Sequence, residues 1–162
     1  KFHPDQVELV LGIGAVGPCD DFSPRVKAVK KFLDCGFRFI GFIHPAAWVA
    51  SEAHLDPTVQ VHAGTIVQPG AVVGAHTILN TGCSVDHDCQ ISNFCHVAPG
   101  AILSGEVKVG CGSHLGTGCV VIQSIEIGKQ CLIAAGATVV KSVENGQHVR
   151  GTPAKPFTLR QT

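Results

Sequence analysis

The sequence predicts a mainly β chain, in which a parallel β-helix follows a small α/β unit. Three observations lead to this prediction. Aliphatic residues recur at every sixth position from Val49 to Val139, and a short fixed period is typical of a solenoid. Glycines gather at one position of this repeat. Ahead of the repeat, two apolar runs flank one helical pattern, as in a βαβ unit.

The six-residue repeat predicts one short strand and one corner per repeat. All sixteen positions met by stepping in sixes from Val49 to Val139 are valine, leucine or isoleucine. The residues four places after each of them, from Ala53 to Val143, are nearly all small or medium-sized and mostly apolar. Alternate residues of a strand face the same way, and the fifth position of one repeat is two residues before the first position of the next. Both positions therefore point into the core.

The third and fourth positions are expected to turn the corner. Seven of the sixteen fourth positions are glycine, as expected where the backbone needs positive φ: Gly64, Gly70, Gly82, Gly100, Gly112, Gly118 and Gly136. This pattern resembles the left-handed parallel β-helix of the hexapeptide-repeat transferases, in which three repeats make one triangular coil of about 18 residues.

Five of the eight cysteines occupy the inward fifth position, and we interpret them as small core residues: Cys83, Cys89, Cys95, Cys119 and Cys131. A nucleophilic thiol at this position would face the core. The chain contains no CxxC pair, which argues against a structural zinc site.

The segment before the repeat predicts a strand, a helix and a second strand. "VELVLGIG" and "FRFIGFI" are the two expected strands, and Ser23-Pro24 begins the helix between them. The apolar stripe of the helix and its terminating glycine are Val26, Val29, Phe32, Leu33 and Gly36.

Gly12-x-Gly14-x-x-Gly17 follows the first strand and suggests a dinucleotide site. Proline, two aspartates and a second proline separate Gly17 from the helix, and roughly 45 residues are too few for a whole nucleotide-binding domain. We therefore expect residues 1–46 to be the back half of a Rossmann-like α/β domain whose first strand is absent from this chain. The β-helix is expected over 47–146, and an irregular tail over 147–162 is expected to fold over the last coil.

The composition disfavours several classes of partner. The formal net charge is zero and the pI is near 7.2, so no basic surface is expected for nucleic acid or an anionic membrane. The longest nearly apolar run, "FRFIGFIHPAAWVA", is shorter than the roughly 20 residues that span a bilayer. The chain begins at Lys1 and has no methionine, so we expect its natural start, with any signal peptide, to lie outside this numbering.

The stretch "SVDHDCQISNFCHVAPGA" contains the candidate site. His87 falls at a third position, on a corner, with Asp86 before it and Asp88 in the place usual for glycine. His96 points outward from a strand. Since none of these residues faces the core, the alternative to a functional role is a solvated surface. One coil further on (87 + 18 = 105) lies Gly105, which would leave room for a ligand beside the imidazole.

Surface histidines on a β-helix raise two other possibilities. The γ-class carbonic anhydrases resemble this architecture and bind zinc through three histidines, two of them five residues apart. No two of the nine histidines here are five apart, so we expect no metal. An ice-binding or purely structural β-helix would carry regular threonine arrays, and this sequence has none.

Three segments make a family resemblance specific: "LNTGCSVDHDCQISNFCHVAPGAILSGEVKVG", "LGTGCVVIQSIEIGKQCLIAAGATVVKSV" and "GTPAK". They closely resemble the sugar O- and N-acyltransferases of the sialic acid O-acetyltransferase type, which include bacterial nucleotide-aminosugar acetyltransferases. The resemblance runs from about Val7 to Phe157. It implies a Rossmann-like domain for the nucleotide sugar, a left-handed β-helix for acetyl-CoA, and a cytoplasmic homotrimer with active sites between neighbours. "GIGAVGPCDDFSPR" replaces the family's usual Gly-Asn-Asn type of turn.

The resemblance also implies roles for individual residues. His87 and Asp88 correspond to the catalytic pair, while Asn80 and His96 correspond to residues that contact the substrate. Imidazole can accept a proton from an amine or hydroxyl near neutral pH, and an adjacent aspartate can orient the ring. Direct attack on the thioester needs no covalent enzyme intermediate, because holding both substrates together supplies much of the acceleration.

For the coenzyme, the resemblance implies Gly105, Thr117 and Ala135 along the pantetheine arm and Lys155 near a phosphate. The chain passes a corner between His87 and His96, so both can join one site only across a subunit boundary, as in a threefold trimer. The alternative function is a non-catalytic trimeric β-helix scaffold.

Overall fold

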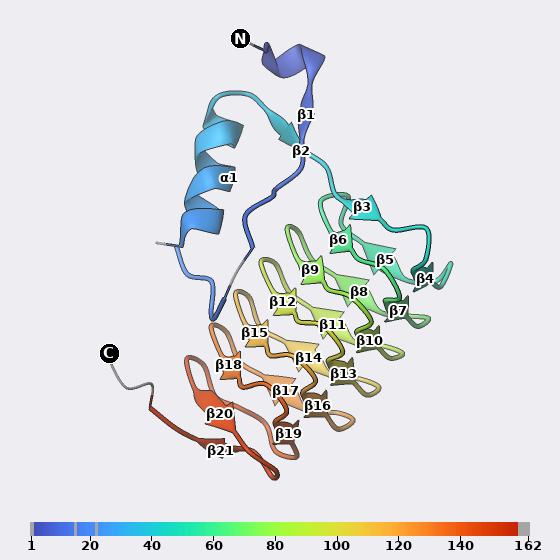
Figure 1. Cartoon of the computed structure of the whole chain (residues 1–162), viewed down its shortest axis with the longest axis vertical. Helices are drawn as coiled ribbons and strands as arrows, with labels where there is room; N and C mark the ends of the chain where they lie inside the picture. Colours follow the sequence, from blue (N-terminus) through green and yellow to red (C-terminus); the bar gives the residue numbers. More distant parts are fainter. Residues whose placement is uncertain (1, 15, 22, 159–162) are drawn as a thin grey trace.

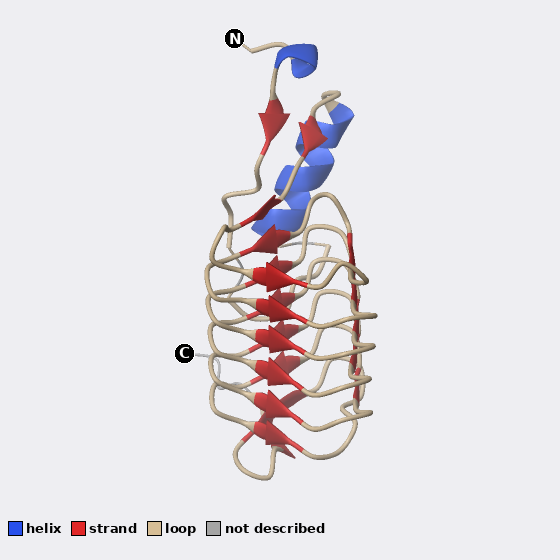
Figure 2. Ribbon diagram, turned by 90° about the vertical axis from the view of Figure 1, so that its right-hand side faces the viewer, coloured by secondary structure: helices blue, strands red, loops and turns tan. Residues whose placement is uncertain are grey.

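The chain forms a parallel β-solenoid of the left-handed type, with a small α/β unit at its N-terminal end (Figure 1). The computed structural model describes residues 2–14, 16–21 and 23–158. Figure 2 shows the coils stacked one above another, with the N-terminal unit at one end of the stack. The predicted mainly β chain built on a β-helix is confirmed.

Three sheets form the faces of the solenoid. The six-stranded sheet contains β4 (Trp48–Val49), β7 (Ile66–Val67), β10 (Ser84–Val85), β13 (Ile102–Leu103), β16 (Val120–Val121) and β19 (Thr138–Val139). The five-stranded sheet contains β5 (His54–Leu55), β8 (Val72–Val73), β11 (Gln90–Ile91), β14 (Lys108–Val109) and β17 (Glu126–Ile127). The eight-stranded sheet contains β3 (Phe42–Ile43), β6 (Gln60–Val61), β9 (Ile78–Leu79), β12 (His96–Val97), β15 (His114–Leu115), β18 (Leu132–Ile133), β20 (His148–Arg150) and β21 (Lys155–Pro156).

The inward positions of the repeat form one continuous core. First-position residues such as Val85 and Leu103 are fully buried, and the five fifth-position cysteines are buried as well. Burial raises the thiol pKa to about 11 for Cys83 and Cys89, to about 12 for Cys95 and Cys119, and in the same direction for Cys131. These thiols therefore stay protonated and act as packing groups, as the sequence predicts.

Backbone with positive φ turns the corners. The seven glycines at fourth positions have φ between 65° and 74°. Six residues other than glycine also occupy fourth positions and have φ between 55° and 61°: His76, Asp88, Phe94, Glu106, Ser124 and Gln130. Non-glycine residues rarely adopt this conformation, and the surrounding coils hold them there.

The N-terminal unit is a βαβ arrangement preceded by one short helix. Its elements are η1 (Pro4–Gln6), β1 (Glu8–Leu9), α1 (Pro24–Asp34) and β2 (Arg38–Phe39), and β1 pairs with β2 in parallel. Ser23 caps α1, since its hydroxyl oxygen accepts a hydrogen bond from the Val26 N–H at 3.3 Å. Within the predicted apolar stripe, Val26 and Val29 are buried, whereas Phe32 and Leu33 remain 38% and 49% exposed.

The glycine motif does not lead directly into this helix. Helix α1 begins at Pro24, seven residues after Gly17 (24 − 17 = 7), whereas a dinucleotide motif opens the helix at its glycines. With one α-helix among its described residues, the N-terminal unit does not confirm the expected Rossmann-like domain.

The single strand expected for "FRFIGFI" is in fact two strands. Arg38–Phe39 pairs with β1, but Phe42–Ile43 pairs with Gln60–Val61 and begins the solenoid. Gly41 lies between them, and its N–H donates a hydrogen bond to the Pro57 carbonyl at 2.7 Å. A Cβ at position 41 would collide with the carbonyl of Val59. The glycine thus lets the chain pass against the first coil, and the solenoid starts earlier than Val49.

Hydrogen bonds attach the N-terminal unit to the solenoid. The guanidinium of Arg25, which is 2% exposed, donates to the carbonyls of Ile13 and His76. The Gln60 side-chain amide donates to the Leu11 carbonyl at 2.7 Å. These bonds satisfy buried polar groups that the sequence pattern does not reveal.

The segment after the repeat is more regular than expected. β20 adds a parallel strand next to β18, and β21 returns antiparallel beside β20. The expected irregular tail is therefore a short hairpin that extends the eight-stranded sheet, and residues 159–162 lie outside the described residues. In the described part of the chain, no helix has the length and hydropathy needed to cross a bilayer.

We expect Gly41→Ala to lower the free energy of unfolding by about 1–3 kcal/mol, because the added methyl group overpacks the backbone around Val59. Gly12→Ala is the matched control, since no heavy atom lies within 4 Å of a Cβ placed there. Chemical denaturation of both variants measures the difference. Equal stabilities for the two variants would show that the approach at Gly41 is not tight.

Candidate active site

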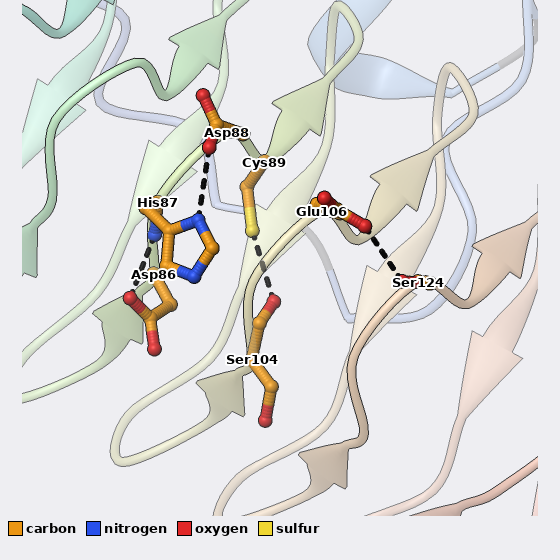
Figure 3. Close-up of polar contacts among 7 residues, drawn as sticks. All are labelled: Asp86, His87, Asp88, Cys89, Ser104, Glu106 and Ser124. Atoms are coloured by element: carbon orange, nitrogen blue, oxygen red, sulfur yellow. Dashed lines mark hydrogen bonds and ion pairs between the residues drawn. The ribbon is translucent and has the colours of Figure 1, made fainter.

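His87 lies on the corner between β10 and β11, which is one edge of the solenoid. Asp86 precedes it, and the Asp86 carboxylate accepts a hydrogen bond from the His87 backbone N–H at 2.7 Å. Asp88 takes the fourth position with φ of 59°. This backbone turns the Asp88 side chain beside the His87 ring (Figure 3).

The contact between His87 and Asp88 determines which ring nitrogen carries the proton. His87 Nδ1 lies 2.9 Å from Asp88 Oδ2. An ionised carboxylate only accepts hydrogen bonds, so Nδ1 is the protonated nitrogen. In the neutral ring Nε2 is therefore left with its lone pair. This is the arrangement that a general base needs.

Nearby carboxylates favour the protonated form of His87. The hydrogen bond to Asp88 raises the pKa of His87 above its usual value, and the charges of Asp86, Asp88 and Glu106 act in the same direction. The ring itself is exposed.

Gly105 gives the His87 ring its space. A Cβ at position 105 would lie 2.5 Å from His87 Nε2 and 2.6 Å from Cε1. The next residue, Glu106, donates its backbone N–H to the His87 carbonyl at 2.9 Å, and its carboxylate accepts a hydrogen bond from the Ser124 hydroxyl at 2.7 Å (Figure 3). The sequence predicts that the missing side chain of Gly105 leaves room for a ligand beside the imidazole. In the structure the imidazole of His87, from the preceding coil, fills that space itself.

Asn80 and His96 form a second polar cluster. The Asn80 side-chain nitrogen lies 3.1 Å from His96 Nε2. His96 is on β12, whose partner in register on the next coil is His114 on β15. The two imidazoles meet edge to face, with centroids 4.9 Å apart and an interplanar angle of 85°. The 18-residue step therefore brings the two histidines together.

Burial lowers the pKa of His114 to about 4, and the neighbouring His96 acts in the same direction. His114 is thus neutral at physiological pH, and it adds no charge to the cluster.

The two clusters lie apart within one chain. His87 is on the edge between the six-stranded and five-stranded sheets, whereas His96 is on the eight-stranded face. The structure therefore agrees with the sequence expectation that the two histidines occupy different faces of a single solenoid.

The predicted coenzyme residues are also divided between places. Gly105 is next to His87, but Thr117 and Ala135 are on the corners that follow β15 and β18, the same edge as Asn80. The backbone bond from Gly136 N–H to the Thr117 carbonyl at 2.9 Å joins these two coils. Lys155 is exposed on β21.

Sequence reasoning missed Glu106 and Ser124 at the His87 edge. Each follows Asp88 by a whole number of coils (88 + 18 = 106, 106 + 18 = 124), so the period itself carries the signal.

Within residues 2–14, 16–21 and 23–158, no three His, Cys, Asp or Glu side chains are grouped as metal ligands would be.

No family model matches the chain. Among curated proteins, the bifunctional protein GlmU of Syntrophotalea carbinolica is 28% identical over 71 residues, which cover 41% of this chain and 14% of GlmU. The similarities to solved structures are more extensive.

The acetyltransferase domain of PglB from Neisseria gonorrhoeae matches with a TM-score of 0.88 and 33% identity, covering 96% of this chain and 73% of that domain. The same domain in complex with acetyl coenzyme A matches at 37% identity with a TM-score of 0.79, covering 82% of this chain and 65% of its own. A variant of perosamine N-acetyltransferase from Caulobacter crescentus, in complex with CoA and GDP-perosamine, matches at 36% identity with a TM-score of 0.81.

This chain spans 64% of the perosamine N-acetyltransferase, and the alignment covers 83% of this chain. The likeness to the PglB domain extends over nearly the whole chain and most of that domain. The chain belongs to the family of hexapeptide-repeat sugar acyltransferases that includes the bacterial nucleotide-aminosugar acetyltransferases.

Proposed function

We propose that the protein transfers an acetyl group from acetyl-CoA to an amine of a nucleotide sugar, with His87 as the general base. The observation that carries this proposal is the exposed His87–Asp88 pair, whose 2.9 Å contact leaves Nε2 as the proton acceptor. The ligands in the structures of the relatives, CoA with GDP-perosamine and acetyl coenzyme A, support the choice of substrates.

In the proposed reaction, His87 Nε2 takes a proton from the acceptor as its nitrogen attacks the thioester carbonyl. The new C–N bond forms a tetrahedral intermediate, which collapses as the C–S bond breaks and CoA leaves with a proton. Asp88 stabilises the imidazolium that forms and keeps the ring in place. The backbone N–H of Gly105 is the proposed donor to the oxyanion.

The charges around His87 favour an amine over a hydroxyl as the acceptor. Asp86, Asp88 and Glu106 all raise the pKa of His87, and the same negative potential attracts the ammonium group of an aminosugar. The ammonium group must first lose one proton to solvent to become a nucleophilic amine. His87 then removes a second proton as the amine nitrogen attacks the thioester.

We place the active site between subunits of a homotrimer, with His87 from one chain and His96 and Asn80 from its neighbour. Three exposed apolar side chains beside the His87 edge support a subunit contact: Trp48, Ile66 and Ile102, which are 53%, 41% and 46% exposed, share one column of the six-stranded face in which Ser84 separates Ile66 from Ile102. Exposed apolar surface of this kind commonly marks an interface.

Acetyl-CoA would lie along this interface, against Gly105 of one chain and Thr117 and Ala135 of the next, with Lys155 near a coenzyme phosphate. The N-terminal unit would belong to a Rossmann-like domain for the nucleotide. The exposed Phe32 and Leu33 on α1 support a larger α/β domain, because such a helix normally buries its whole apolar stripe. A cytoplasmic location remains a prediction.

His87→Ala should reduce acetyl-CoA turnover by about a hundredfold or more, because the acceptor loses its base. The measurement is release of free CoA thiol with a panel of nucleotide aminosugars and sialic acid. His54→Ala, an exposed histidine on the five-stranded face, is the matched control. Full activity of His87→Ala on an accepted sugar would contradict the proposal, and no binding of acetyl-CoA at all would favour the scaffold.

The pH dependence of kcat/KM should follow the neutral form of His87. Because Asp88 raises the pKa of His87, the part of the rise of kcat/KM with pH that His87 controls should extend to that raised pKa, and deprotonation of the acceptor's ammonium group should add the same rise in wild type and variant. In Asp88→Asn the pKa should fall toward its usual value of about 6.5, so the rise should move to lower pH while the plateau drops. Asparagine tolerates the positive φ at position 88. An unchanged profile would exclude His87 as the titrating base.

Mixing His87→Ala with His96→Ala should restore activity if one site takes its two histidines from different chains. In randomly mixed trimers, about a quarter of the sites would contain both. Each variant alone is expected to be nearly inactive, and light scattering gives the oligomeric state. Activity that stays at the level of the single variants after subunit exchange would place both residues in the same chain.

A further inference from the structure

The side-chain amide of Asn80 has a fixed orientation. Its Oδ1 accepts a hydrogen bond from the Thr81 backbone N–H at 2.8 Å and a longer one from the Thr81 hydroxyl at 3.3 Å. A backbone N–H can only donate, so the atom that faces it is the amide oxygen. The amide nitrogen of Asn80 therefore points away from Thr81 and toward His96.

This orientation determines the role of His96 Nε2, which lies 3.1 Å from Asn80 Nδ2. An amide NH₂ group donates hydrogen bonds and accepts none. Nε2 must then accept, and the proton of the neutral ring is on Nδ1. A proton on Nε2 would face the N–H of Asn80.

We propose that Asn80 is a positioning residue that fixes His96 in its Nδ1–H tautomer, so that His96 acts as a hydrogen-bond donor and not as a second base. This inference rests on the proposed acetyl transfer. It separates the two histidines by role. His87 has Nδ1 bonded to a carboxylate and Nε2 ready to accept a proton, whereas the Nε2 of His96 is already occupied by the Asn80 amide.

The assignment also changes the role expected for Asn80. The family resemblance implies that Asn80 contacts the sugar, but in this structure its amide contacts Thr81 and His96. Its effect on the acceptor would then pass through the orientation and tautomer of the His96 ring.

The test is the tautomer of His96 in the full chain labelled with ¹⁵N-histidine, read from long-range ¹H–¹⁵N correlations at about pH 8, where imidazoles are neutral. His96→Gln identifies the signals. We expect the wild type to carry the proton on Nδ1. In Asn80→Asp a carboxylate oxygen takes the place of the donor, and the proton should move to Nε2. Thr81→Val is the matched control, because it keeps the backbone N–H and should leave the proton on Nδ1.

A wild-type ring protonated on Nε2, or an unchanged tautomer in folded Asn80→Asp, would overturn the inference. If Asn80→Asp does not fold, Asn80→Ala replaces it and should show His96 protonated on Nε2 in part of the population. In turnover assays, Asn80→Ala should lower kcat/KM about tenfold, the effect of one hydrogen bond. The tautomer is measured without substrate, so failure of this inference and failure of acetyl transfer give separate results.

Discussion

The parallel register between residues 18 apart is the interaction on which the rest of the structure depends. Strand N–H groups of each coil donate to carbonyls of the next coil, corner N–H groups donate to carbonyls of the previous coil, and the pairing places Ser84 beside Ile102 and His96 beside His114. Stacked strands then share their side-chain directions, so a residue type repeated at this spacing forms a column. The buried columns make the core, and the exposed columns place His114 beside His96 and Ser124 beside Glu106.

The solenoid was predictable because its signal repeats. The first position is valine, leucine or isoleucine in all sixteen repeats, the fifth is mostly small and apolar, and the corner glycines mark the turns independently. The position of His87 on a corner, the acidic residue at the fourth position after it, and the stacking of Gly105 over His87 follow from counting along this frame, whereas the filling of that space by the imidazole does not. Sequence reasoning failed at both ends of the repeat. At its start, Gly41 divides one apolar run between two sheets. At its end, the hairpin of β20 and β21 has no six-residue period.

Other features depend on side-chain geometry that no spacing contains. Arg25 can be buried because its guanidinium donates hydrogen bonds to two carbonyls, one in the N-terminal unit and one in the solenoid. The contact between Asn80 and His96 spans 16 residues and joins a corner to a strand on the neighbouring coil, so the 18-residue column count does not find it. The pairing of Ser124 with Glu106 does lie on a column, but serine and glutamate are ordinary surface residues.

The space at Gly105 has a consequence for how this protein can change in length. The imidazole of His87 fits only because the residue one full coil later has no side chain. A one-residue insertion between them would place another residue against the ring, and shifted strands would also turn core side chains outward. Gains or losses between these two positions are therefore tolerated poorly, whereas adding or removing whole coils beyond them leaves the stacking at His87 intact. Such a protein varies in length by coils rather than by single residues.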